Sequence, residues 1–241
     1  ENVHGDTARS QAQGKLIQGS VELIRGNVDE VMTISAEVAD DAEASGWNTE
    51  LGRALSQRAN VLSHLGKPAE ALAAYERTLS VLEGESSEEL ARHLVSLGVA
   101  RRRANNVGGA IEACARAVEI YEALDRSRDL VRARSELGCS MLGHGRSDEA
   151  RDLLKQAGTD AASLGSSQAQ WRALLLEGLL EILAEQWAPA RVCFRRAGEV
   201  FDVEGIPKTV VEMHEAFIEA CDGDVSDAEE TLNRAVATFE R

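Results

Sequence analysis

The stretch HLGKPAEALAAYERTL, residues 64–79, reads as a turn followed by one amphipathic helix. Proline is tolerated in the first turn of a helix because its missing N–H would have no partner there, so Pro68 marks the start. Ala71, Tyr75 and Thr78 then fall on one face, since their spacing is i, i+4, i+7. A larger residue between two small ones predicts a helix whose axis approaches a neighbouring helix closely.

The same small–large–small pattern recurs along the whole chain. The first members of its six copies are Val31, Ala71, Ala110, Ala150, Ala190 and Ala228, which follow one another at intervals of 38 to 40 residues. Twelve residues before each stands a Gly or Ala, namely Gly19, Ala59, Gly98, Gly138, Gly178 and Ala216. We therefore expect each copy to hold two packed helices, an A helix with a small residue midway and the B helix described above.

Turn residues separate the two helices of most copies. Five residues before the first member stand Gly26, Gly66, Asn105, Gly145 and Gly223, whereas the fifth copy has Glu185 there. We predict twelve helices, over residues 6–25, 28–45, 48–65, 67–83, 87–104, 107–124, 128–144, 147–164, 167–184, 187–204, 207–222 and 225–240. In pairs they form six repeats within one domain, 1–241, over residues 6–46, 47–85, 86–125, 126–165, 166–205 and 206–241.

Composition excludes several classes of protein. A formal net charge of -15 disfavours direct contact with nucleic acid and with anionic membranes. The chain lacks both an apolar run of about 18 residues and a signal peptide, and without an initiator Met it is expected to be a processed product or a fragment. The spacing of the four cysteines matches no metal-binding or redox motif, so we expect reduced thiols that fill helix interfaces. Reduced thiols predict a reducing compartment, the cytoplasm.

The positions of the small residues resemble those of the tetratricopeptide repeat family. The repeat length of about 40 residues is similar to that of the long-repeat branch, which occurs in kinesin-light-chain-like repeats and in sensor arrays of bacterial signalling proteins. The segment ALDRSRDLVRARSELG, residues 123–138, is similar to the helix junctions of that branch. The resemblance implies an all-α, right-handed superhelical solenoid of antiparallel helices. It also implies a concave wall of A helices that binds proteins or peptides.

The family's concave positions carry a column of arginines here. Six residues before the A-helix Gly or Ala stand Arg53, Arg92, Arg132 and Arg172 in four consecutive repeats, with further polar groups at Asn60, His64, Arg102 and Arg103. One interpretation is a site for an acidic peptide or another anion, because guanidinium groups match carboxylates. The other is structural pairing with neighbouring acids, for example Arg92 with Glu76 or Glu83.

The concave positions of the last two repeats are apolar instead. They are Leu175, Leu179, Ile182, Met213 and Phe217. One interpretation is a groove filled by a following helix or domain that this chain lacks. The alternative is a groove that binds an amphipathic helix of a partner.

No motif for catalysis, for a metal or for a cofactor was found, since the histidines are scattered and no glycine-rich phosphate loop or nucleophile motif occurs. The sequence therefore predicts a non-catalytic binding scaffold, as a regulatory or sensor module of a larger bacterial-type protein. Two alternatives stay open. One is a receptor for a small molecule or signalling peptide, and the other is self-association, such as a homodimer, through the end of the last repeat.

Overall fold

The computed structural model describes residues 2–83, 87–125, 127–200, 206–221, 223 and 225–239, and within these ranges it contains helices and no strand. The helices are α1 (Asn2–Arg25), α2 (Val28–Ser45), α3 (Asn48–His64), α4 (Pro68–Leu82), α5 (Ser87–Arg103), α6 (Val107–Ala123), α7 (Ser127–Leu142), α8 (Ser147–Ser163), α9 (Ser167–Leu183), α10 (Trp187–Val200), α11 (Ile206–Cys221) and α12 (Val225–Phe239). The all-α prediction is confirmed.

Most helix ends lie within two residues of their predicted positions. The clearest difference is at the start of the chain, where α1 begins at Asn2 rather than at residue 6. The predicted end of the tenth helix at residue 204 lies outside the described residues, as do the repeat boundaries at residues 85, 86, 126, 205 and 241.

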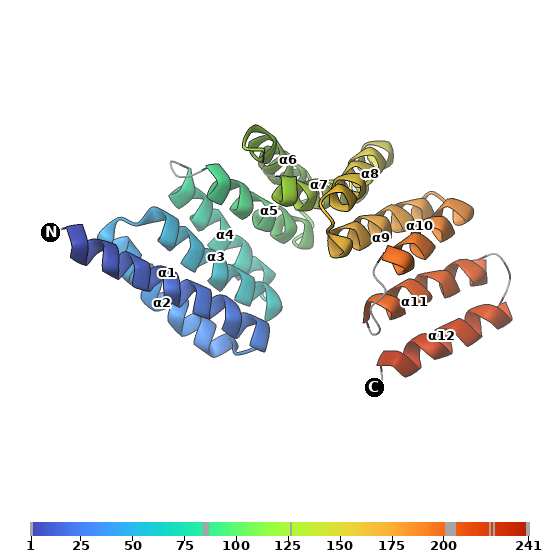
Figure 1. Cartoon of the computed structure of the whole chain (residues 1–241), viewed down its shortest axis with the longest axis horizontal. Helices are drawn as coiled ribbons and strands as arrows, with labels where there is room; N and C mark the ends of the chain where they lie inside the picture. Colours follow the sequence, from blue (N-terminus) through green and yellow to red (C-terminus); the bar gives the residue numbers. More distant parts are fainter. Residues whose placement is uncertain are drawn as a thin grey trace. The chain divides into compact units, whose positions relative to one another are not determined.

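The chain divides into two compact units, Glu1–Asp125 and Arg126–Arg241. The first holds α1 to α6 and the second holds α7 to α12 (Figure 1). Within each unit every odd-numbered helix packs on the even-numbered helix that follows it, and each pair packs on the next pair. The expectation that all six repeats form one domain stays a prediction.

Close packing inside a pair depends on the small A-helix residue. A Cβ atom added at Gly138 would lie 2.9 Å from Cγ of Leu154, and one added at Gly178 would lie 2.7 Å from Cζ of Phe194. Leu154 and Phe194 are the middle members of their B helices, and both are fully buried. The predicted contact between the glycine and the larger residue is therefore confirmed in these two repeats.

The turn between the A and B helices requires a left-handed residue. Gly26, Gly66 and Gly145 have φ angles of 80°, 71° and 78°, in the region where a Cβ atom is unfavourable. Glu185, which departs from the sequence pattern, nevertheless has a φ of 55° at the same position. The fifth repeat therefore keeps the turn geometry and carries steric strain in it.

Replacing Glu185 with glycine should raise the free energy of unfolding by about 0.5–1 kcal/mol. The relieved strain is roughly 1–2 kcal/mol, and the added freedom of the unfolded chain offsets roughly 0.4–1 kcal/mol of it. Glu185 is exposed, so little else is lost. Urea denaturation measures the change, and Gly145→Ala, at the same turn position of the preceding repeat, should lower stability instead. A Glu185→Gly chain no more stable than the wild type would contradict this geometry.

Candidate functional site

The predicted column lies on the A helices. We define the A-helix wall as the residues six before each A-helix Gly or Ala, which are Gln13, Arg53, Arg92, Arg132, Arg172 and Val210. The first three belong to the first unit and the last three to the second.

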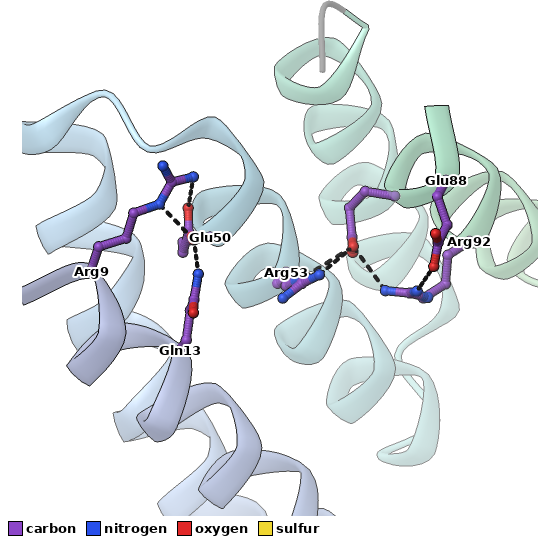
Figure 2. Close-up of polar contacts among 7 residues, drawn as sticks. Arg9, Gln13, Glu50, Arg53, Glu88 and Arg92 are labelled. Carbon is purple, nitrogen blue, oxygen red and sulfur yellow. Dashed lines mark hydrogen bonds and ion pairs between the residues drawn. The ribbon is translucent and has the colours of Figure 1, made fainter. Parts of the chain in front are cut away.

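In the first unit the wall begins with a buried carboxylate (Figure 2). Arg9 of α1 donates from Nε and Nη2 to the two oxygens of Glu50 on α3, both at 2.9 Å. Gln13 donates to the same carboxylate at 2.7 Å. Burial of Glu50 raises the pKa of its carboxyl, but the hydrogen bonds from Arg9 and Gln13 outweigh it and hold that pKa below its ordinary value.

The contact between α3 and α5 repeats this arrangement, with an arginine on one A helix paired to an acid on the next (Figure 2). Arg53 of α3 donates to Glu89 of α5 from Nε at 3.0 Å and from Nη2 at 2.8 Å. Arg92 donates to Glu89 at 2.8 Å and to Glu88 at 2.9 Å. Both arginines therefore form internal ion pairs. The expected partner of Arg92 was wrong, because Glu76, an exposed B-helix acid, lies instead 3.7 Å from Arg101.

A second column explains these pairs, and the sequence analysis missed it. Nine residues before the A-helix Gly or Ala stand Glu50, Glu89, Asp129 and Ala169 in the second to fifth repeats. In the first unit, the acid at this position accepts from the wall residue of the preceding repeat. The sequence contains this second column as a periodic acid three residues before the arginine of the same repeat.

In the second unit the wall has one partnered and one open arginine. Arg172 of α9 forms an ion pair with the buried Glu136 of α7. Arg132 is exposed and makes no hydrogen bond or ion pair with the residues that the structure describes. Arg132 has no such partner because the equivalent position of the next repeat is Ala169, whereas the second and third repeats have Glu50 and Glu89 there.

The other predicted polar residues lie in the first unit. The Asn60 side chain accepts a hydrogen bond from the Tyr75 hydroxyl at 2.5 Å, and Arg103 donates to Ser63 Oγ at 2.8 Å. His64 is exposed at the end of α3, and Arg102 is partly buried on α5. A ligand-binding role for these residues stays a prediction.

The apolar positions do not form one groove. The expectation for Leu175 is corrected, because this residue is buried in a core cluster with Val211 and Ile218 of α11. Leu179 and Ile182 pack partly buried against that cluster. The next A helix of this chain, α11, therefore fills the space at these three positions, which neither interpretation of the apolar positions had proposed.

The last repeat differs because its apolar residues are exposed. Met213 and Phe217 on α11 are 42% and 50% exposed. Leu232 on α12 is 47% exposed, although it is the middle member of its B helix and was expected to be buried. Among the described helices, α12 packs mainly against α11, and these side chains stay partly exposed although the Phe217 ring contacts the Trp187 ring edge-on.

Within the described residues no group of three His, Cys, Asp or Glu side chains is placed to hold a metal ion. No described helix has both the length and the apolar character needed to cross a membrane. None of the four cysteines forms a disulfide, and only Cys114 and Cys193 are buried. Cys139 is partly buried and Cys221 is exposed, so the expectation of an interface position is wrong for Cys221.

Part of the chain matches a known repeat family, and its fold resembles that of solved structures. Residues 50–123 match the family model described as tetratricopeptide repeat. A search of curated proteins by sequence finds no match. Among solved structures, the chain resembles BtubC (BKLC) from P. vanneervenii, with a TM-score of 0.75 and 15% identity over 88% of this chain and 91% of that one.

Two further solved structures have a similar fold. A Rap protein complexed with Competence and Sporulation Factor has a TM-score of 0.71 and 14% identity over 95% of this chain and 76% of that one. The apo form of the quorum sensor NprR from B. thuringiensis has a TM-score of 0.74 and 10% identity over 95% of this chain and 65% of that one. Residues 50–123 therefore match the tetratricopeptide repeat, and the helix pairs of the chain share the fold of these solved structures.

Proposed function

We propose that this chain is a non-catalytic module that binds a protein or peptide on its A-helix wall, with Arg132 as the central contact. The open guanidinium of Arg132 carries the proposal, because the other three arginines of the column are already neutralised by Glu88, Glu89 and Glu136. Arginine presents a planar fork that suits carboxylates. An acidic segment of a partner is therefore the favoured ligand.

The fold and the charge support this role. A Rap protein of the same fold is complexed with Competence and Sporulation Factor, and NprR is a quorum sensor, so this architecture suits a regulatory or sensor module of a larger bacterial-type protein. The net charge of -15 disfavours nucleic acid as a direct ligand. A reducing cytoplasm, consistent with four cysteines that form no disulfide, is part of the proposal.

Charge reversal at Arg132 tests the proposal. Partners captured from a lysate of the source organism by the wild-type chain should be recovered about tenfold less by Arg132→Glu, because a charge-assisted hydrogen bond is replaced by repulsion. The matched control is Arg195→Glu on the B helix α10, which is equally exposed and also lacks a described partner. Equal loss with both variants, or none with either, would contradict a binding role of the wall.

Two other ligands are distinguished by simple observations. A receptor for a small molecule or signalling peptide would bind a low-molecular-weight fraction of the lysate rather than a protein. A second copy of the chain is favoured by the exposed apolar side chains of Met213, Phe217, Leu232 and Val236 in the last repeat. Sedimentation at increasing protein concentration separates this self-association from both binding roles.

A further inference from the structure

Each unit contains a junction at which two successive A helices contact each other, α1 with α3 in the first unit and α7 with α9 in the second. The two junctions differ at the residue that supplies a carboxylate. In the first unit, Arg9 and Gln13 stand ten and six residues before the A-helix glycine, and they hold the Glu50 carboxylate of the next A helix. The same positions in the second unit are Arg128 and Arg132 on α7. The position of Glu50 is taken by Ala169 on α9, and both junctions bring their A helices into contact.

The junction in the second unit therefore has cationic groups and lacks their carboxylate. Arg128 and Arg132 are one helical turn apart, and both are exposed. Neither makes a hydrogen bond or an ion pair with any side chain in the described parts of the chain. In the first junction, by contrast, Glu50 is completely buried and accepts from both of its neighbours.

A cavity opens where the missing carboxylate would lie. Its volume is about 300 Å³, and its lining residues are Arg128, Val131, Ala161, Leu164, Gly165, Ser166 and Ala169. Val131 and Ala161 belong to a buried apolar cluster against which Leu164 and Ala169 pack. The cavity thus combines an apolar wall with a guanidinium at its edge.

We propose that this cavity binds a carboxylate carried next to an aliphatic group on a partner peptide. The carboxylate lies against Arg128 at the cavity, as Glu50 lies against Arg9. Arg132 stands at the position of Gln13, one turn along α7 and outside the cavity lining, and adds its positive charge. The aliphatic group packs on Val131, Leu164 and Ala169. That a peptide supplies the carboxylate rests on the proposed function; the site itself rests on the comparison of the two junctions.

The chemistry favours a carboxylate because the chain uses these same positions to hold one. Bidentate pairing with arginine is strong when the partner is partly removed from water, which the apolar lining of the cavity provides. The carboxylate can be the C-terminus of a peptide or an Asp or Glu side chain. These two sources present the same oxygens to Arg128 and Arg132, so the experiment has to separate them.

Three small probes test the site in the full chain by NMR, observed at the methyl groups of Val131 and Leu164. N-acetyl-leucine offers a terminal carboxylate, N-acetyl-Leu-Glu-amide offers a side-chain carboxylate, and N-acetylleucinamide offers none. At least one of the two acids should give saturable shifts, with the amide binding about tenfold more weakly or less. The acid that binds better identifies the source. Shifts from the amide equal to those from both acids, or none from any probe, would overturn the proposal.

The substitution Ala169→Glu gives a readout that needs no ligand. It restores the residue found at this position in the second and third repeats, so it should raise the melting temperature and abolish binding of the acidic probe. In an Arg128→Gln/Arg132→Gln background the same substitution should lose its stabilising effect, and Ala169→Gln serves as the neutral control of equal size. If Ala169→Glu changes stability equally in both backgrounds, the two arginines do not form a carboxylate site.

The two proposals fail in different ways. Should Arg132→Glu lose the partner while no probe moves the methyl signals, the carboxylate site is refuted and the binding module stands. Should an acidic probe bind while Arg132→Glu and Arg195→Glu capture partners equally, the site is real and the wall is not where the protein partner binds.

Discussion

Replacing Phe194 with alanine is expected to lower the free energy of unfolding of the second unit by about 3–5 kcal/mol, the range for a fully buried phenylalanine. The Phe194 ring lies directly beneath Gly178, where an added Cβ atom would lie 2.7 Å from Cζ. The other side of the ring stacks on His214 of α11, with 4.7 Å between ring centroids. One side chain therefore joins the two helices of the fifth repeat and connects them to the sixth.

The loss should be local at first, because each repeat contacts only its neighbours. We expect denaturation followed by circular dichroism to show a broadened transition, with α9 to α12 unfolding before the rest. Phe217→Ala is the matched control, since this ring is 50% exposed on α11 and its removal should change stability by about 0.5 kcal/mol or less. Equal losses from the two substitutions would mean that Phe194 does not hold the repeats together.

The sequence predicted the helices well because their packing depends on residue size at fixed spacing. Gly178 and Phe194 are recognisable as a contact pair from their positions in the repeat, since a glycine in the middle of a helix otherwise lowers its stability. The turn at Glu185 shows the limit of this reasoning. The equivalent turn position holds a left-handed glycine in the neighbouring repeats, at Gly145 and Gly223. Glu185 adopts the same conformation in the fifth repeat, although a residue with a Cβ atom disfavours it.

The sequence places the arginines in one column but does not give their ion-pair partners. The column of Arg53, Arg92, Arg132 and Arg172 follows from the period, whereas the partner of each depends on which acid the next A helix brings near. Arg92 illustrates this, because its partners Glu88 and Glu89 lie one turn away on its own helix, whereas the expected partners were acids of B helices. Ala169 was informative only after Glu50 and Glu89 had been located in the structure.

Acidification should destabilise the first unit through His93. This side chain is 3% exposed on α5, and its Nε2–H donates to the Tyr75 carbonyl at 2.7 Å while Nδ1 accepts from the Ser56 hydroxyl at 3.1 Å. Burial lowers the pKa of the imidazole from 6.5 to about 4, against the opposing effects of the Tyr75 carbonyl and the Glu89 charge. The folded chain therefore holds the neutral ring at a pH at which the unfolded chain takes up a proton.

The sign of the effect follows from that difference. Because the folded pKa lies below the unfolded one, the stability contributed by neutral His93 is complete above pH 6.5 and is lost as the pH falls towards 4. Each unit of pKa difference corresponds to about 1.4 kcal/mol, so the loss across this window is roughly 3 kcal/mol. Carboxylates such as Glu50, whose pKa is also lowered, lose their contribution as the pH falls as well. The wild-type curve alone therefore does not isolate the histidine.

A His93→Gln variant separates the two contributions, because glutamine keeps a hydrogen-bonding side chain and does not titrate. The free energy of unfolding of each chain, measured by urea denaturation between pH 7 and pH 4, should fall more steeply for the wild type, and the two curves should converge by roughly 3 kcal/mol. Parallel curves would show that the imidazole reaches solvent and is protonated in the folded chain. The packing of α5 against α3 and α4 around His93 would then be looser than the contacts to Ser56 and Tyr75 require.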